Sequence, residues 1–361
     1  MSFEEFKQEI EIGSRDCRKK GTIIRSKERE VIKSIIEICD QEAKQKSLYF
    51  PLRQATKRAA QYAKVSERTV KRIREQVKWG VEFNDDDCPS GLTKIKRGKM
   101  SLKFACNLSF MFPECASFIG RYQLAKKVGF KAVESGFPLG YSVEQVVEAK
   151  TKADVQQVLI NVFTGDVTKG DLGFAAVPGE EQNFQNSIEL TIEYAKALDC
   201  RKIHVMSGKV EILTKGNDEA YENNLRYAVK RFEEENIVGL IEPINSQTVP
   251  NYYMNSFDKG LSIVKKINSP NLRLMLDIFH LQQICGNLTY SIREYLPYVG
   301  HVQIAQVPDR NEPDTPGEID YQYVLSLLEK EGYEDYVGLE YKPKTSTFEG
   351  IKWIRRFGFS F

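Results

Sequence analysis

Two stretches in the second half of the chain, VGLIEPI at 238–244 and LRLMLDIF at 272–279, decide the fold. Each is a short apolar run, and an amphipathic helical segment lies between them, which is typical of strands buried in a parallel sheet. Six further runs share this rhythm: LKFACNLS (102–109), KAVESGF (131–137), QVLINVF (157–163), KIHVMS (202–207), HVQIAQV (301–307) and YVGLEYKP (336–343). Eight strands that alternate with helices over residues 101–361 predict a (β/α)8 TIM barrel.

The competing fold is a doubly wound parallel sheet. That fold usually carries a Gly-rich phosphate loop after an early strand, and no such loop occurs in this sequence. The barrel is therefore the favoured interpretation.

The charge of the chain is divided unevenly. Residues 1–100 carry 24 Lys and Arg against 16 Asp and Glu, whereas residues 101–361 carry 28 against 34. This asymmetry indicates two modules. We predict a small all-α, helix-turn-helix-like domain over residues 1–80, a linker over 81–100 and the barrel over 101–361.

The composition excludes several classes of protein. Of the 361 residues, 41% are apolar and 28% are charged, which argues against disordered and fibrous proteins. No run of 18 apolar residues occurs and the first residues, MSFEEFKQEIEIG, resemble no secretory signal, so we expect neither a membrane span nor secretion. The seven cysteines form no CxxC pair, which favours a reduced, cytoplasmic setting.

Oxygen-bearing side chains recur where the later predicted strands end. They are Glu242, Asp277, Gln303 and Glu340, from four successive strands. The carboxyl ends of barrel strands carry the chemistry in this fold, and a hard divalent cation would offset the cost of burying several acids. The sequence therefore predicts a metal site with these four ligands, and the alternative is that the acids form salt bridges with nearby Lys or Arg residues.

Two of the three histidines of the chain lie beside these acids. His280 and His301 are predicted to orient a ligand or to contact the substrate. Glu242 and Glu340, on separate strands, could flank one small α-hydroxycarbonyl ligand, one removing a proton and the other returning one to the adjacent carbon. This arrangement is typical of an aldose–ketose isomerisation through an enediolate.

Ten segments of the second module occur in the order found in one family. They are FACNLSFMFPE, LINVFTGD, AAVPGEEQNF, YAKALDC, LIEPIN, LDIFHLQ, GNLTYSIREYLP, GHVQIAQVP, PGEIDY and GLEYKP. Through them, residues of about 101–357 resemble the hydroxypyruvate isomerase family of the xylose-isomerase-like barrels. The resemblance implies interconversion of hydroxypyruvate and 2-hydroxy-3-oxopropanoate (tartronate semialdehyde), a reaction of glyoxylate metabolism.

The resemblance also implies roles for individual residues. The catalytic glutamates of the family fall on Glu242 and Glu340, and the ligands of a divalent metal, Mg²⁺ or Mn²⁺, fall on the four residues named above. Arg310, in VPDRNEP, or Lys209, in MSGK, is expected to pair with the substrate carboxylate, since arginine suits a carboxylate fork. Asn311 stands where the family usually has glycine, which affects the loop and not the chemistry.

Related barrels leave one close alternative. Endonuclease-IV-like barrels bind several zinc ions through many histidines, and this chain has three. Xylose isomerase itself uses two metals and a hydride shift, whereas this ligand set suggests one metal and proton transfer. An isomerase of a four-carbon 2-oxo acid would use the same residues, so the sequence leaves both small 2-oxo acids as candidate substrates.

The first module resembles a different kind of protein. The stretch PLRQATKRAAQYAKVSERTVKRIREQ (51–76) is similar to a helix-turn-helix, with a second helix that presents Arg68, Lys71, Arg72 and Arg74. Residues 15–80 carry 19 basic and 8 acidic side chains, which suits contact with DNA phosphates. Two interpretations stay open: a DNA-binding protein, nuclear in that case, whose barrel is a passenger or sensor, or a solvated basic bundle that binds no nucleic acid.

Overall fold

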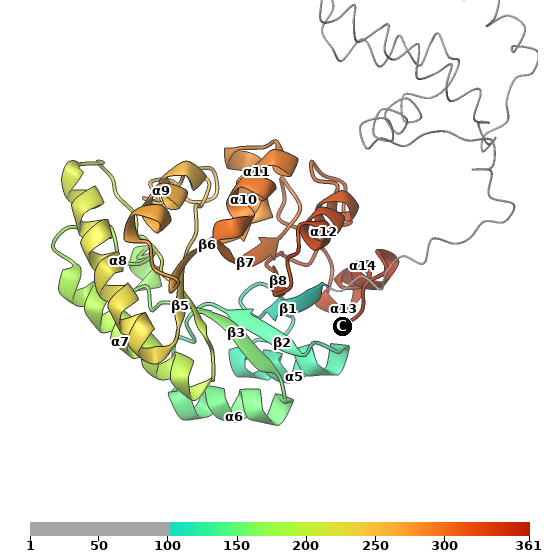
Figure 1. Cartoon of the computed structure of the whole chain (residues 1–361). Helices are drawn as coiled ribbons and strands as arrows, with labels where there is room; N and C mark the ends of the chain where they lie inside the picture. Colours follow the sequence, from blue (N-terminus) through green and yellow to red (C-terminus); the bar gives the residue numbers. More distant parts are fainter. Residues whose placement is uncertain (1–101) are drawn as a thin grey trace, which may run out of the picture. The chain divides into compact units, whose positions relative to one another are not determined.

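The structure is a computed structural model that describes residues 102–361. Eight parallel strands form the centre of this part of the chain. They pair in the order β1-β2-β3-β4-β5-β6-β7-β8 and close into a barrel, which confirms the predicted (β/α)8 fold (Figure 1). The strands are β1 (Lys103–Asn107), β2 (Ala132–Ser135), β3 (Gln156–Asn161), β4 (Lys202–His204), β5 (Val238–Ile241), β6 (Leu272–Asp277), β7 (Val299–Ile304) and β8 (Tyr336–Leu339). The predicted domain at 1–80 and the linker at 81–100 lie outside the described residues.

Helices surround the strands on the outside of the barrel (Figure 1). They are α5 (Phe118–Val128), α6 (Val143–Ala153), α7 (Glu181–Ala197), α8 (Lys215–Glu235), α9 (Phe257–Ile267), α10 (Ile278–Ile284), α11 (Leu288–Tyr295), α12 (Tyr321–Lys330), α13 (Thr347–Gly350) and α14 (Trp353–Arg356). Local chemistry sets several of their ends. In α6, for example, Ser142 and Gln145 form a capping box and Asp154 ends the helix in the left-handed region. Among residues 102–361, no helix is both long and apolar enough to cross a membrane.

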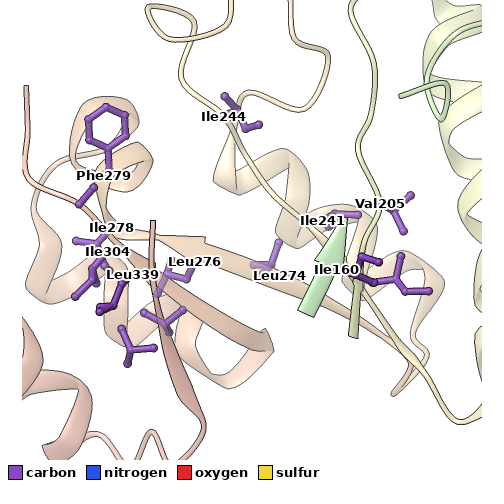
Figure 2. Packing of buried hydrophobic residues seen from close by; sticks show 14 of the residues in the cluster. Ile160, Val205, Ile241, Ile244, Leu274, Leu276, Ile278, Phe279, Ile304 and Leu339 are labelled. Atoms are coloured by element: carbon purple, nitrogen blue, oxygen red, sulfur yellow. The ribbon is translucent and has the colours of Figure 1, made fainter. Parts of the chain in front are cut away.

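Side chains alternate between two cores along each strand. In β6, Leu274 and Leu276 join the main core between the sheet and the helices (Figure 2). Met275, between them in sequence, packs instead with Leu159 and Leu240 in a small separate cluster. This period of two is that of a pleated strand with one face toward the helices and one toward the barrel interior. Asp277, two residues after Met275, is thereby directed to the interior at the carboxyl end of the barrel.

Candidate active site

The four predicted oxygen ligands come together at the carboxyl ends of β5 to β8. Glu242 and Glu340 directly follow β5 and β8, Asp277 is the last residue of β6, and Gln303 lies near the end of β7. Asp277 and Gln303 are 0% and 1% exposed, Glu242 is 4% exposed, and the Glu340 side chain is 13% exposed. The predicted convergence of these side chains is therefore present in the fold.

Arg310, from the loop between β7 and α12, lies among these acids. Its Nη2 donates to Oε2 of Glu340 at 2.5 Å and to Oδ2 of Asp277 at 3.2 Å. The guanidinium carbon lies 4.7 Å and 4.9 Å from the ring centroids of Phe110 and Phe279. The alternative predicted from the sequence, ion pairing of the acids with a basic side chain, thus occurs for Asp277 and Glu340. The predicted pairing of Arg310 with a substrate carboxylate stays a prediction.

His280 links Glu242 to Asp277. Its Nε2 lies 3.7 Å from Oε1 of Glu242 and 3.6 Å from Oδ2 of Asp277. Its Nδ1 accepts from the backbone N–H of Asn245 at 3.2 Å and lies 2.7 Å from Nδ2 of the same residue. Oδ1 of Asn245 accepts from the backbone N–H of Thr248, so its Nδ2 is left as the donor to the ring.

This pattern fixes the tautomer of the His280 ring. A nitrogen that accepts from two donors carries no proton, so the ring proton resides on Nε2, which faces the acids. Burial, followed by the charges of Arg310 and His204, lowers the pKa of His280 well below its usual value, so the ring is neutral. Glu242, Asp277 and His280 are close enough to hold a cation together. In this tautomer the Nε2–H of His280 faces the two acids at distances longer than a hydrogen bond.

The acids of the site hold protons more firmly than ordinary carboxyl groups. Burial, followed by the charges of Glu340 and Asp277, raises the pKa of Glu242 well above its usual value. Burial also raises the pKa of Asp277, and it raises the pKa of Glu340 to about 8 despite the opposing charge of Arg310. The site therefore contains more buried acids than Arg310 alone neutralises. With its pKa of about 8, the carboxyl of Glu340 can exchange a proton near neutral pH.

Two oxygen atoms of this group lack any hydrogen-bond partner within residues 102–361. They are Oε1 of Glu242 and Oε1 of Gln303, and both are buried. A buried acceptor without a donor is costly and rare, which requires an explanation. Carboxylate and amide oxygens are ligands that Mg²⁺ and Mn²⁺ prefer, so these atoms fit the divalent cation predicted from the sequence.

The other two histidines have different surroundings. Nε2 of His204, at the end of β4, lies 3.6 Å from Oε2 of Glu242, and burial, followed by the charge of His301, lowers the pKa of His204 to about 3. His301 is fully buried, and its Nε2 lies 2.6 Å from Oε2 of Glu134 on β2. The His301 ring therefore contacts Glu134, one layer deeper in the barrel than the acids, and its predicted role in orienting a ligand or contacting the substrate stays a prediction.

Comparison with known proteins places this chain in one family. The family described as "Xylose isomerase-like TIM barrel" matches residues 122–357. The chain belongs to this family. A protein of Homo sapiens named "Putative hydroxypyruvate isomerase" is 44% identical over 263 residues, which cover 71% of this chain and 95% of the relative.

Bacterial members of the family are also similar over the barrel. Hydroxypyruvate isomerase of Escherichia coli (strain K12) is 35% identical over 255 residues, 70% of this chain and 98% of the relative. The 2-oxo-tetronate isomerase of Haemophilus influenzae is 38% identical over 257 residues, 71% of this chain and 99% of the relative. Among solved structures, one described as an AP endonuclease of family 2 from Brucella melitensis superposes with a TM-score of 0.68 at 39% identity, covering 71% of this chain and 98% of that chain.

The remaining predicted residues of this family member lie elsewhere. Lys209 is exposed and lines a cavity of about 580 Å³ together with Asp166, Asp171 and Glu180. None of the four predicted metal ligands lines that cavity. Of the two residues predicted to bind the substrate carboxylate, Arg310 therefore lies at the acids and Lys209 does not. The predicted DNA-contacting residues lie outside the described residues: Arg68, Lys71, Arg72 and Arg74.

The sequence interpretation missed three interior residues of the site. Asn107 on β1, Glu134 on β2 and His204 on β4 are all buried at the carboxyl end of the barrel interior. One signal was available for Glu134, because it interrupts the apolar run KAVESGF and lies two residues from the buried Ala132. In a strand of period two, that spacing puts the acid on the same face as the alanine, inside the barrel.

Proposed function

We propose that this barrel is an isomerase that interconverts hydroxypyruvate and 2-hydroxy-3-oxopropanoate by proton transfer, with Glu242 and Glu340 as the acid–base pair. The observation that carries the proposal is the continuous set of contacts joining the two glutamates. It runs from Glu242 through His280 and Asp277 to Arg310 and Glu340. The names of the human and Escherichia coli relatives support the same reaction class.

The chemistry follows from two carboxyl groups on opposite flanks of one ligand. One ionised glutamate removes a proton from C3 of hydroxypyruvate, and the electrons of that C–H bond form the enediolate. The second glutamate, protonated, delivers a proton to C2. The proton of the C3 hydroxyl passes to the oxygen on C2, so that C3 becomes the aldehyde and C2 carries the hydroxyl. The raised pKa of Glu242 and the pKa of about 8 for Glu340 support this, since the carboxyl of Glu340 can hold a proton at neutral pH.

We also propose that Glu242, Asp277, Gln303 and Glu340 hold a divalent cation, Mg²⁺ or Mn²⁺. When bound, such a cation would polarise the substrate carbonyl and so make the neighbouring C–H more acidic. The unpartnered oxygens of Glu242 and Gln303 support this assignment. His280 would direct its Nε2–H toward the carboxylates of Glu242 and Asp277, which lie 3.7 Å and 3.6 Å away.

Arg310 is proposed to bind the substrate carboxylate. Its Nε donates to the backbone oxygen of Glu340 at 3.2 Å, and its Nη2 donates to the side-chain carboxylates of Glu340 and Asp277. Nη1 makes no hydrogen bond to any residue of 102–361, which leaves one guanidinium nitrogen for a ligand. A planar guanidinium packed between two aromatic rings loses little further freedom when it binds a carboxylate.

Amide variants of the two glutamates test the acid–base roles. In D2O, the wild-type chain is expected to convert hydroxypyruvate with solvent deuterium entering the product at the carbon that receives the proton, observed by NMR. Glu242→Gln and Glu340→Gln should each lower turnover on the order of 10²- to 10⁴-fold, because neither amide can transfer the proton. The exposed Glu219→Gln is the matched control and should retain full activity. Near-normal turnover of both site variants would contradict the assignment.

The chain length of the substrate needs its own measurement. The Haemophilus influenzae relative is named for a four-carbon acid, and the same residues could serve it. A panel of three- and four-carbon 2-oxo acids should give the higher kcat/KM for hydroxypyruvate, and the opposite order would favour the 2-oxo-tetronate assignment. The endonuclease name of the Brucella melitensis structure is not carried over, because this chain has only three histidines to bind several zinc ions.

For residues 15–80 we propose a second function, contact with DNA, on the observation of 19 basic against 8 acidic side chains. The full chain should then bind duplex DNA with an affinity that falls steeply as salt rises. Replacing Arg72 and Arg74 by alanine should weaken binding and reduce the salt slope by about one for each phosphate that the variant no longer neutralises. Absence of binding at low salt would leave the basic stretch as a solvated surface.

A further inference from the structure

A fully buried carboxylate near the centre of the barrel has no role in the reaction proposed above. Glu134 lies on β2 and is 0% exposed. Its Oε1 accepts from Nδ2 of Asn107 at 2.9 Å and from Nε2 of Gln303 at 2.8 Å. Its Oε2 lies 2.6 Å from Nε2 of His301. Two amide NH2 groups therefore donate to this carboxyl group, and the His301 ring lies within hydrogen-bond distance of its other oxygen.

The fold leaves space for this carboxylate at β8, which is separated from β2 only by β1 in the closed ring. Gly338 on β8 faces it, and a Cβ at that position would collide with both oxygens and the carboxyl carbon of Glu134. Glu134 therefore reaches across from β2 to β7 and β8 because β8 presents no side chain there. This places the acid against Gln303, 169 residues further along the chain.

The contact with Glu134 decides which end of the Gln303 amide is free. An amide offers one NH2 group and one oxygen, and Glu134 engages the NH2 group. The reversed amide would set its oxygen against the carboxylate, two acceptors with no proton between them. The oxygen that remains is Oε1, which is buried and has no partner within residues 102–361.

Asn107 connects the same carboxylate to Glu340. Its Nδ2 also lies 3.3 Å from Oε1 of Glu340, and its Oδ1 accepts from the backbone N–H of Ser109 at 3.0 Å. The second of these bonds fixes the orientation of the Asn107 amide, with its NH2 group toward the acids. Two of the four residues proposed to bind the cation are thus held, directly or through Asn107, by Glu134.

We propose that Glu134 is a positioning residue that turns the Gln303 amide so that its carbonyl oxygen, and not its NH2 group, faces the bound cation. The inference rests on the proposed function, because it needs a cation at the site. Glu134 itself touches neither substrate nor cation. Groups that orient metal ligands in this way typically change metal affinity 10- to 100-fold when they are removed.

Two conservative variants separate positioning from charge. Glu134→Gln removes the charge, but Asn107 keeps the new amide oxygen turned toward Gln303, and His301 can accept from the new NH2 group after a tautomer change. Glu134→Asp keeps the charge but withdraws the acceptor by one methylene. Positioning requires Glu134→Asp to bind the cation on the order of 10-fold more weakly than Glu134→Gln, whereas an effect of charge alone requires the opposite order.

The measurement is a calorimetric titration of the full chain with Mn²⁺ alone, without substrate, alongside a thermal melt of each variant. In a Gln303→Met background, which has no amide to orient, Glu134→Asp should cause no further loss of affinity. An equal loss in that background, or a Glu134→Asp chain that binds Mn²⁺ as the wild type does, would overturn the inference alone. A wild-type chain that binds no Mn²⁺ would contradict the metal proposal itself, and the inference with it.

Discussion

At the scale of the residue, Arg310 is the main positive charge among the acids of the site. It adopts a positive φ of 58°, a backbone conformation that side-chain-bearing residues rarely adopt. Hydrogen bonds on both sides hold it there, since its N–H donates to the oxygen of Gln306 at 2.8 Å and its oxygen accepts from Lys342 at 2.7 Å. The loop thereby directs the guanidinium to Asp277 and Glu340 instead of to solvent.

Removal of this guanidinium should destabilise the chain in a metal-dependent way. Arg310→Met leaves the buried acids without their positive partner, and we expect a loss of about 3 kcal/mol in the free energy of unfolding without added metal. Mn²⁺ should reduce that loss, because it neutralises the same acids. Urea unfolding with and without Mn²⁺ measures both values.

The matched control for this prediction is Arg226→Met on α8. Arg226 pairs with Glu222 at the surface, and its side chain is 48% exposed, so we expect a change below about 1 kcal/mol. An equal, metal-independent loss in both variants would show that Arg310 contributes no more than a surface ion pair.

At the scale of the element, β8 shapes the interior by the absence of a side chain. Gly338 separates Val337 and Leu339, which pack in the core between the sheet and the helices. The empty interior position lets the carboxylate of Glu134 extend past β1 and β8 to Gln303 on β7. A strand of ordinary composition would have filled this space.

A methyl group on β8 should disturb the site from within. Gly338→Ala is expected to destabilise the chain by about 1–3 kcal/mol through overpacking against Glu134, and to weaken Mn²⁺ binding by displacing the Gln303 amide. Gly216→Ala near the start of α8 is the control, because a Cβ there meets other atoms only at 3.5 Å or more. That control should be neutral or slightly stabilising, since alanine suits a helix better than glycine. Equal thermal melts of the two variants would contradict the packing argument.

At the scale of the whole molecule, the barrel gathers acids that are distant in sequence into one layer. Glu242 and Glu340 are separated by almost a hundred residues, yet both lie at the carboxyl ends of strands that close into one ring. The apolar layers of the interior below them give no compensation for several buried negative charges. The intact barrel is therefore expected to gain stability from a bound cation.

Removal of the cation should be visible in the stability of the full chain. A chelator is expected to lower both the turnover and the melting temperature, and Mn²⁺ at 100 times its Kd should restore about 2.7 kcal/mol in the free energy of unfolding. Glu242→Gln, which lacks one proposed ligand charge, should gain less from Mn²⁺. A melting temperature and turnover that do not respond to chelator would refute the metal while leaving the acid–base roles of the glutamates intact.

The barrel and its ring of acids could be predicted from the sequence because both depend on local pattern. Buried parallel strands are continuous apolar runs of four to eight residues, and the residue at which each run ends marks the carboxyl end of a strand. That reasoning found Glu242, Asp277, Gln303 and Glu340, and Arg310 followed from the resemblance of its loop to the family.

Only the tertiary structure decided which partners these residues have. His301 was expected to orient a ligand or to contact the substrate, and the structure pairs it with Glu134, 167 residues away. That pairing depends on the register of β2 against its neighbours and on the space left by Gly338. Neither feature can be predicted from the sequence of a single segment. Apolar periodicity reports which face of an element is buried, whereas the choice of polar partners inside a closed barrel is made by strands that meet only when the ring is complete.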